Sequence, residues 1–200
     1  TALATFCSGT DGLVKTWYDQ SGNSNDATQT VTSNQPKIYD ATTGVVMENG
    51  KPAITRTSQE MQLDFAIDRS SGVFSLAFVG QAVDRSVVLS DNGSGYILFA
   101  KNNESNSAFG NLSSTSVYVD GSLSSVSSAG DAYTAFINNQ SLISAFTNHS
   151  WTSNSLSIGY SGTVTGMYQV QEFVIYTTDQ STNRTGIETN INDYYNIYTP

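Results

Sequence analysis

Short apolar or alternating runs, each closed by Gly, Asn, Asp or Ser, follow one another along nearly the whole chain. Such runs are typical of β-strands, and the turn residues between them favour antiparallel pairing. They predict strands at residues 13–19, 53–56, 61–65, 73–80, 86–90, 95–100, 116–120, 132–138, 141–146, 156–160 and 167–176. The Asp91-Asn92-Gly93 and Asp120-Gly121 sequences predict hairpin turns. This spacing, with only 3 prolines, indicates an all-β sandwich or barrel.

The run at 73–80 is the most apolar of these segments, so we expect a central strand that is buried on both faces. A chain of 200 residues fits one domain, residues 1–200. A different periodicity occupies the end of the chain, where a helix is predicted over about 181–197. Its apolar positions recur at spacings of about four and seven and are Ile187, Ile191, Tyr194 or Tyr195, and Tyr198. Asp179 or Ser181 can cap its start, and Glu188 is expected to face outward.

The charge balance excludes several classes of partner. The formal net charge is -9, from 17 acidic and 8 basic residues, so phosphate is repelled and nucleic acid is not expected to bind. No apolar run approaches the roughly 18 residues that a membrane-spanning helix needs, so no membrane insertion is expected. Cys7 is the only cysteine and His149 the only histidine, which excludes an intrachain disulfide and a zinc site built on several such ligands.

Hydrolysis of glycosides needs two carboxyl groups at a fixed separation. The chain has 5 glutamates, Glu48, Glu60, Glu104, Glu172 and Glu188, and none lies in an E-x-D-x-E strand pattern. No G-x-S-x-G sequence is present to pair a serine with His149. The residues therefore predict a non-catalytic domain.

The stretch at 16–29, TWYDQSGNSNDATQ, has a local geometry of its own. On a strand, Trp17 and Asp19 share one side. Asp19 then begins a tight turn in which its carboxylate accepts backbone N–H groups of Ser21 and Gly22. Gly22 supplies the positive φ that the turn needs.

Together with ENGKPA at 48–53 and DQSTNRTGIETNINDYYNIY at 179–198, this stretch resembles the concanavalin A-like (laminin G-like) domains of phage tail-fibre, other virion and bacterial surface proteins. It is more distantly similar to the catalytic domain of α-L-arabinofuranosidase B. The resemblance implies a two-sheet antiparallel jelly-roll sandwich with a C-terminal helix. It also implies that the domain begins before Thr1, so the chain is expected to be N-terminally truncated.

The arabinofuranosidase resemblance is incomplete. In that family the cysteine corresponding to Cys7 pairs with a second one, whose position falls at Gly12 here. The vicinal cysteine pair of that family's substrate site is absent as well, since the chain has no second cysteine. No acidic residue can be matched to the catalytic carboxylates of that family. The resemblance therefore implies the fold without the hydrolysis.

Two kinds of site are predicted. Laminin G-like folds often hold one Ca²⁺ through loop oxygens, so Asp19, Asp26 and Glu172 are the candidate calcium ligands. The alternative is that no cofactor is bound and Asp19 only builds its turn. Sugar binding needs exposed aromatic rings beside polar side chains, and the candidates are Trp151, His149, Asn154 and Tyr96.

The expected function is recognition or adhesion, through carbohydrate, in an extracellular or virion-surface location. The expected partner is a cell-surface glycan or polysaccharide, together with other virion or surface-appendage subunits. A structural decoration or assembly module of a virus particle is one alternative. An arabinofuranosidase-like glycoside hydrolase is the other.

Overall fold

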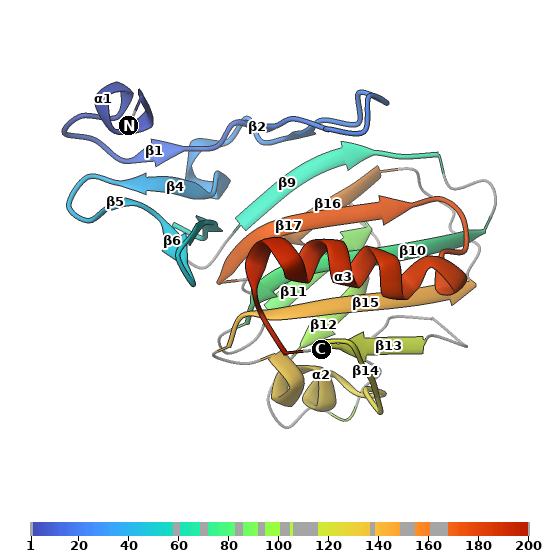
Figure 1. Cartoon of the computed structure of the whole chain (residues 1–200). Helices are drawn as coiled ribbons and strands as arrows, with labels where there is room; N and C mark the ends of the chain where they lie inside the picture. The colour runs from blue at the N-terminus through green and yellow to red at the C-terminus, as the bar shows by residue number, and fades with distance from the viewer. Residues whose placement is uncertain are drawn as a thin grey trace.

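The computed structural model describes residues 2–57, 61–68, 72–82, 86–91, 95–100, 105, 116–136, 139–148, 155–160 and 168–199. Antiparallel strands dominate it (Figure 1). What we call the large sheet has the order β1 (Gly12–Leu13), β4 (Lys37–Asp40), β8 (Ile54–Thr55), β17 (Gln169–Tyr176), β10 (Val73–Gln81), β15 (Ser141–Asn148), β13 (Ser116–Val119) and β14 (Ser122–Ser124), with β5 (Gly44–Val45) beside β4.

What we call the smaller sheet has the order β12 (Gly95–Ala100), β11 (Ser86–Asp91), β16 (Ser155–Tyr160), β9 (Met61–Ala66), β3 (Ala27–Thr28) and β2 (Thr16–Trp17). A separate hairpin pairs β6 (Met47–Glu48) with β7 (Lys51–Pro52). The helices are α1 (Ala2–Phe6), α2 (Ala129–Phe136) and α3 (Arg184–Tyr195), with 3₁₀ turns η1 (Thr32–Asn34) and η2 (Ser181–Asn183). No helix in the described ranges is both long and apolar enough to cross a membrane.

The core lies between the two sheets and includes Leu76 and Phe78 of the large sheet and Leu63 and Leu156 of the smaller one. The outer face of β10 is covered as well, since Ala77 packs in a second cluster with residues of α3. Neighbouring residues of a strand face opposite sides, so β10 is buried on both faces, which confirms the prediction for 73–80. The two-sheet antiparallel arrangement and the C-terminal helix are likewise as predicted.

Two hairpin turns have, at their central positions, residue types that adopt a positive φ readily. Asp120 and Gly121 have φ of 50° and 78° between β13 and β14, which confirms the turn predicted there. Asn49 and Gly50 have φ of 47° and 74° between β6 and β7. Positive φ at both central residues gives a turn whose twist matches that of the paired strands. The turn after β11 lies outside the described residues.

The predicted strand at 132–138 is wrong, because residues 129–136 form helix α2. The hydroxyl of Ser128 accepts the N–H of Asp131 at 3.1 Å, and the Asp131 carboxylate accepts the N–H of Ser128 at 2.9 Å. This reciprocal pair is a capping box, which satisfies N–H groups that the first turn leaves free. Ala132 and Phe136, four residues apart, then face the core.

The predicted strand at 13–19 is also wrong in part, because it is divided between β1 in the large sheet and β2 in the smaller one. The predicted terminal helix is confirmed, with η2 as its first turn and α3 as its body. Asn196 ends α3 in the left-handed conformation, at φ 53°. Ile191 and Tyr195 pack against the outer face of the large sheet, as the predicted apolar stripe requires.

The prediction that Glu188 faces outward is wrong. Its side chain is 4% exposed and forms an ion pair with Arg184, one turn earlier in α3. Position 188 lies next to Ile187 and seven residues before Tyr195, on the side of α3 that turns toward the sheet. The nearby arginine makes burial of the carboxylate tolerable there.

Candidate functional site

An open groove lies between α3 and the outer face of β17, with a volume of about 920 Å³. Alternate residues of β17 form one wall, and η2 with one side of α3 forms the other. The lining consists of Glu172, Val174, Tyr176, Thr182, Asn183, Gly186, Ile187, Asn190, Ile191, Tyr194 and Tyr195. Aliphatic, aromatic, amide and carboxylate groups are therefore available to one ligand, and the volume lies within the usual range for ligand sites of about 300–1,000 Å³.

Glu172 and Tyr195 form the polar end of this groove. The Tyr195 hydroxyl lies 3.0 Å from Glu172 Oε2 and 3.1 Å from the Gln171 carbonyl oxygen. Burial, with the neighbouring Glu172 charge, raises the pKa of the Tyr195 phenol well above its ordinary value of 10.0. The phenol therefore remains protonated and can donate to Glu172, which leaves the second carboxylate oxygen to accept from a ligand.

Tyr194 supplies an exposed ring beside that pair. It is 56% exposed, and its ring meets the Tyr195 ring edge-on at a centroid distance of 4.8 Å. Lys51 Nζ lies 4.0 Å from the Tyr194 centroid, in cation–π contact. Contacts on two sides hold the ring in place, so it can act as a rigid surface for an apolar ligand face.

The β6–β7 hairpin packs beside this end of the groove. Gln171 Nε2 donates toward the carbonyl oxygens of Glu48, Lys51 and Pro52, at 3.1, 3.2 and 3.2 Å. The side-chain amide of Asn49 reaches the Tyr195 carbonyl oxygen at 3.5 Å. The segment 48–53 and the C-terminal helix, two of the three stretches that carry the sequence resemblance, thus meet at the groove.

The third stretch forms a self-contained loop after β2. The Asp19 carboxylate accepts the N–H of Ser21 at 2.7 Å and that of Asn25 at 2.9 Å, and the Ser21 hydroxyl at 2.8 Å. These bonds, with the Ser21 hydroxyl first, lower the pKa of Asp19. The predicted turn is confirmed, with Gly22 at φ 84°. Asn25, instead of the expected Gly22, is the second backbone donor.

The three predicted calcium ligands are not brought together. Asp26 Oδ1 accepts the N–H of Asp19 at 2.9 Å, so these two carboxylates share one loop beside the smaller sheet. Glu172 instead lies in β17 of the large sheet. Among the described residues, no three or more His, Cys, Asp and Glu side chains form a group that could hold a metal ion. A calcium ion at the Asp19–Asp26 loop stays a prediction.

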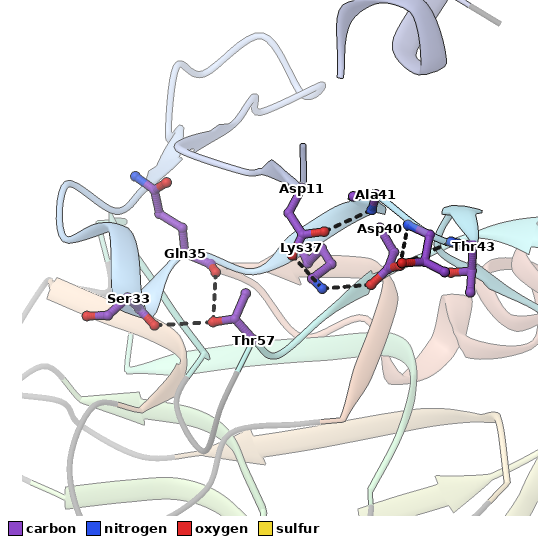
Figure 2. Close-up of polar contacts among 9 residues, drawn as sticks. Asp11, Ser33, Gln35, Lys37, Asp40, Ala41, Thr43 and Thr57 are labelled. Atoms are coloured by element: carbon purple, nitrogen blue, oxygen red, sulfur yellow. Dashed lines mark hydrogen bonds and ion pairs between the residues drawn. The ribbon is translucent and has the colours of Figure 1, made fainter. Parts of the chain in front are cut away.

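A second polar cluster joins Asp11, just before β1, to β4 and the turn that follows β4 (Figure 2). Lys37 Nζ lies 2.7 Å from an Asp11 carboxylate oxygen and 2.8 Å from one of Asp40. The Lys37 ammonium, followed by the N–H groups of Thr42 and Thr43, lowers the pKa of Asp40 far below its ordinary value. Lys37 thus occupies the space between the two carboxylates, and we interpret the cluster as a structural tie.

The same view shows how the chain before β4 is fixed to the end of β8. The Thr57 hydroxyl donates toward the carbonyl oxygens of Ser33 and Gln35, at 3.2 and 3.4 Å (Figure 2). These contacts position short strands that have few ladder bonds of their own. None of the residues drawn there lines the groove.

The predicted sugar-binding residues are not tested by the structure. Trp151, His149 and Asn154 lie outside the described residues. Tyr96 lies in β12, opposite Ser90 of β11, and its side chain is outside the description. Sequence reasoning missed Tyr194, Tyr176 and Asn190 as site residues. The Asn190–Tyr195 stretch carried the only signal, because it places an amide and two aromatic rings on successive helical turns.

The chain matches no protein-family model, no curated protein and no solved structure. The groove itself must therefore carry the functional argument.

Proposed function

We propose that the chain is a non-catalytic recognition domain that binds carbohydrate, built as a jelly-roll sandwich of the concanavalin A-like (laminin G-like) kind. The observation that carries the proposal is the groove, whose lining combines the exposed Tyr194 ring with the polar side chains of Glu172, Asn183 and Asn190. Sugars present both apolar C–H faces and hydroxyl groups, so a site for them combines aromatic rings with amides and carboxylates.

The composition of the chain supports an extracellular or virion-surface location. Charged residues make up only 12% of the chain, and hydroxyl and amide side chains replace them on a surface of net charge -9. Such a surface is hydrated without attracting nucleic acid. We propose a cell-surface glycan or polysaccharide as the partner, and one calcium ion at the Asp19–Asp26 loop as an optional stabilising ligand.

A glycan array, probed with calcium and again with a chelator, tests this function. We expect binding to a restricted set of glycans. Loss of binding in the chelator would assign calcium a part in it. If no glycan is bound in either condition, carbohydrate recognition is refuted.

A second candidate is an assembly module of a virion or surface appendage. Within the described ranges, β17 pairs with β8 only through Gln169 and Val170, so no described strand pairs with that edge from Glu172 to Tyr176. Unpaired edges can accept a strand from another chain. Light scattering over a concentration series measures this, because self-association should increase with protein concentration.

The hydrolase alternative is less well supported. Glu172 is the only carboxylate among the described residues that line the groove, whereas glycosidases work with a pair. Hydrolysis of an aryl arabinofuranoside that is lost in a Glu172→Gln variant would favour an enzyme instead.

A further inference from the structure

The charged side chains in and around the groove favour an uncharged ligand. Among the described residues that line the groove, Glu172 carries the only carboxylate and none is basic. Lys51, the cation at its end, is engaged by the Tyr194 ring. An acidic sugar would therefore meet the Glu172 carboxylate in the groove, on a chain whose net charge is already -9.

The hydrogen-bonding groups suit hydroxyls in particular. Glu172 uses one oxygen to accept from Tyr195, and its other oxygen has no partner among the described residues. Asn190 is exposed, and its side-chain amide likewise has no hydrogen bond to another described residue. A carboxylate accepts O–H groups strongly, and an amide both accepts and donates. Neighbouring sugar hydroxyls provide those complementary donors and acceptors.

The length of the groove suits a chain of several sugars rather than a single sugar ring. The outward-facing residues of β17, from Glu172 to Tyr176, span roughly 13 Å at the usual rise of a strand. On the other wall, the lining from Asn183 at the end of η2 to Tyr194 in α3 spans roughly 16 Å. Thr182, Asn183 and Asn190 are exposed along this length, so the groove is open to solvent at its rim. A polymer can therefore enter from the side without a free end.

We infer that this groove binds an internal stretch of a neutral, linear oligosaccharide, with Glu172 accepting hydroxyl hydrogen bonds and Tyr194 packing against one sugar face. The inference rests on the proposed carbohydrate function and adds the site, the charge class and the side-on binding mode.

The test is titration calorimetry with neutral linear oligosaccharides, such as fragments of β-glucan, mannan and galactan, and with oligogalacturonate as the acidic probe. We expect at least one neutral fragment to bind and to bind more tightly than the acidic one. Tyr194→Ala and Glu172→Gln should each weaken binding by about tenfold or more, since each removes a ring contact or a charged hydrogen bond. Glu172→Gln should also narrow the preference for the neutral probe.

Tyr18→Ala is the matched control, because Tyr18 is 66% exposed and lies in the loop after β2, away from the groove lining. It should leave binding unchanged, and thermal melting of each variant checks that it folds. If Trp151→Ala abolishes binding while the groove variants do not affect it, the inference is wrong and carbohydrate recognition stands. If no fragment binds, the proposed function fails first. A change in oligomeric state in Tyr194→Ala, without a change in glycan affinity, would make the groove a protein contact.

Discussion

Replacing Gln171 with alanine should loosen the β6–β7 hairpin from the large sheet while leaving the apolar core filled. Gln171 is a bulge residue of β17, since Val79 pairs with Glu172 and the next residue of β10, Gly80, pairs with Val170. The bulge directs its buried side chain at the hairpin. There Nε2 lies 3.1–3.2 Å from three hairpin carbonyl oxygens, while Oε1 accepts from Gln140.

The size of the effect follows from these contacts. An amide nitrogen has two hydrogens, so two of the three carbonyls can accept a full hydrogen bond at once. With the bond from Gln140, the alanine variant loses three neutral bonds of about 0.5–1.5 kcal/mol each, or about 1.5–4.5 kcal/mol in all. The hairpin carbonyls lie near the surface and can regain water. We therefore expect a loss of about 2–3 kcal/mol in the free energy of unfolding.

Urea denaturation followed by circular dichroism measures this loss. The m-value should stay unchanged, because the same surface is exposed on unfolding. Gln140→Ala is the matched control, since it removes one of the three bonds and should cost about 1 kcal/mol. Gln171→Glu should be worse than alanine at pH 7, because its carboxylate would face carbonyl oxygens. If Gln171→Ala costs no more than Gln140→Ala, the hairpin does not depend on this side chain.

Three further outcomes are expected. Ser128→Ala should lower stability by about 0.5–2 kcal/mol in the same urea assay, because α2 loses its N-cap. Hydrogen bonds from the Ser128 and Ser127 N–H groups lower the pKa of Asp131 from 3.8 to about 2. The stabilising effect of this carboxylate is therefore full above pH 3.8 and is lost as the pH falls through about 2. In an acid titration followed by circular dichroism, the stability of Asp131→Asn should decrease less steeply between those two pH values than that of the unchanged protein. A Cβ on Gly12 would lie 2.6 Å from Cys7 Sγ, so overpacking in Gly12→Ala should lower the free energy of unfolding by about 1–3 kcal/mol. Gly12→Cys should instead form a disulfide with Cys7 under oxidising conditions, which a loss of free thiol would show.

The sequence predicts a strand best where both of its faces are buried, as in β10. β10 is a nearly continuous apolar run because both of its faces are covered. It pairs with β15 from Val73 to Gly80 and with β17 from Ser75 to Gln81. The 132–138 segment failed because alternation and helical spacing are hard to separate over a short run. The Ser128–Asp131 spacing, which is that of a capping box, held the missing information.

The groove could not be predicted in the same way. Glu172 was singled out from the sequence, but as a calcium ligand. Its hydrogen-bond partner Tyr195 lies 23 positions later in the chain, so no local pattern links the two residues. Only the packing of α3 on the sheet decides that Tyr195 turns inward and Tyr194 outward. The helical stripe permitted either residue, since both continue the spacing from Ile187 and Ile191. Local pattern thus fixes the buried face of the helix without fixing how far it lies from β17.

The groove exists because α3 crosses the large sheet obliquely (Figure 1). At its start, the Arg184 guanidinium lies 4.0 Å from the Tyr118 ring of β13, and Nη1 lies 3.4 Å from the Gly121 carbonyl oxygen. At its end, the Tyr195 hydroxyl bonds to β17. In the sheet order, β10 and β15 separate β17 from β13, so the helix leaves β17 as it is followed back toward Arg184. The contacts of Arg184, which lies outside the lining, thus hold the start of α3 over β13, away from β17.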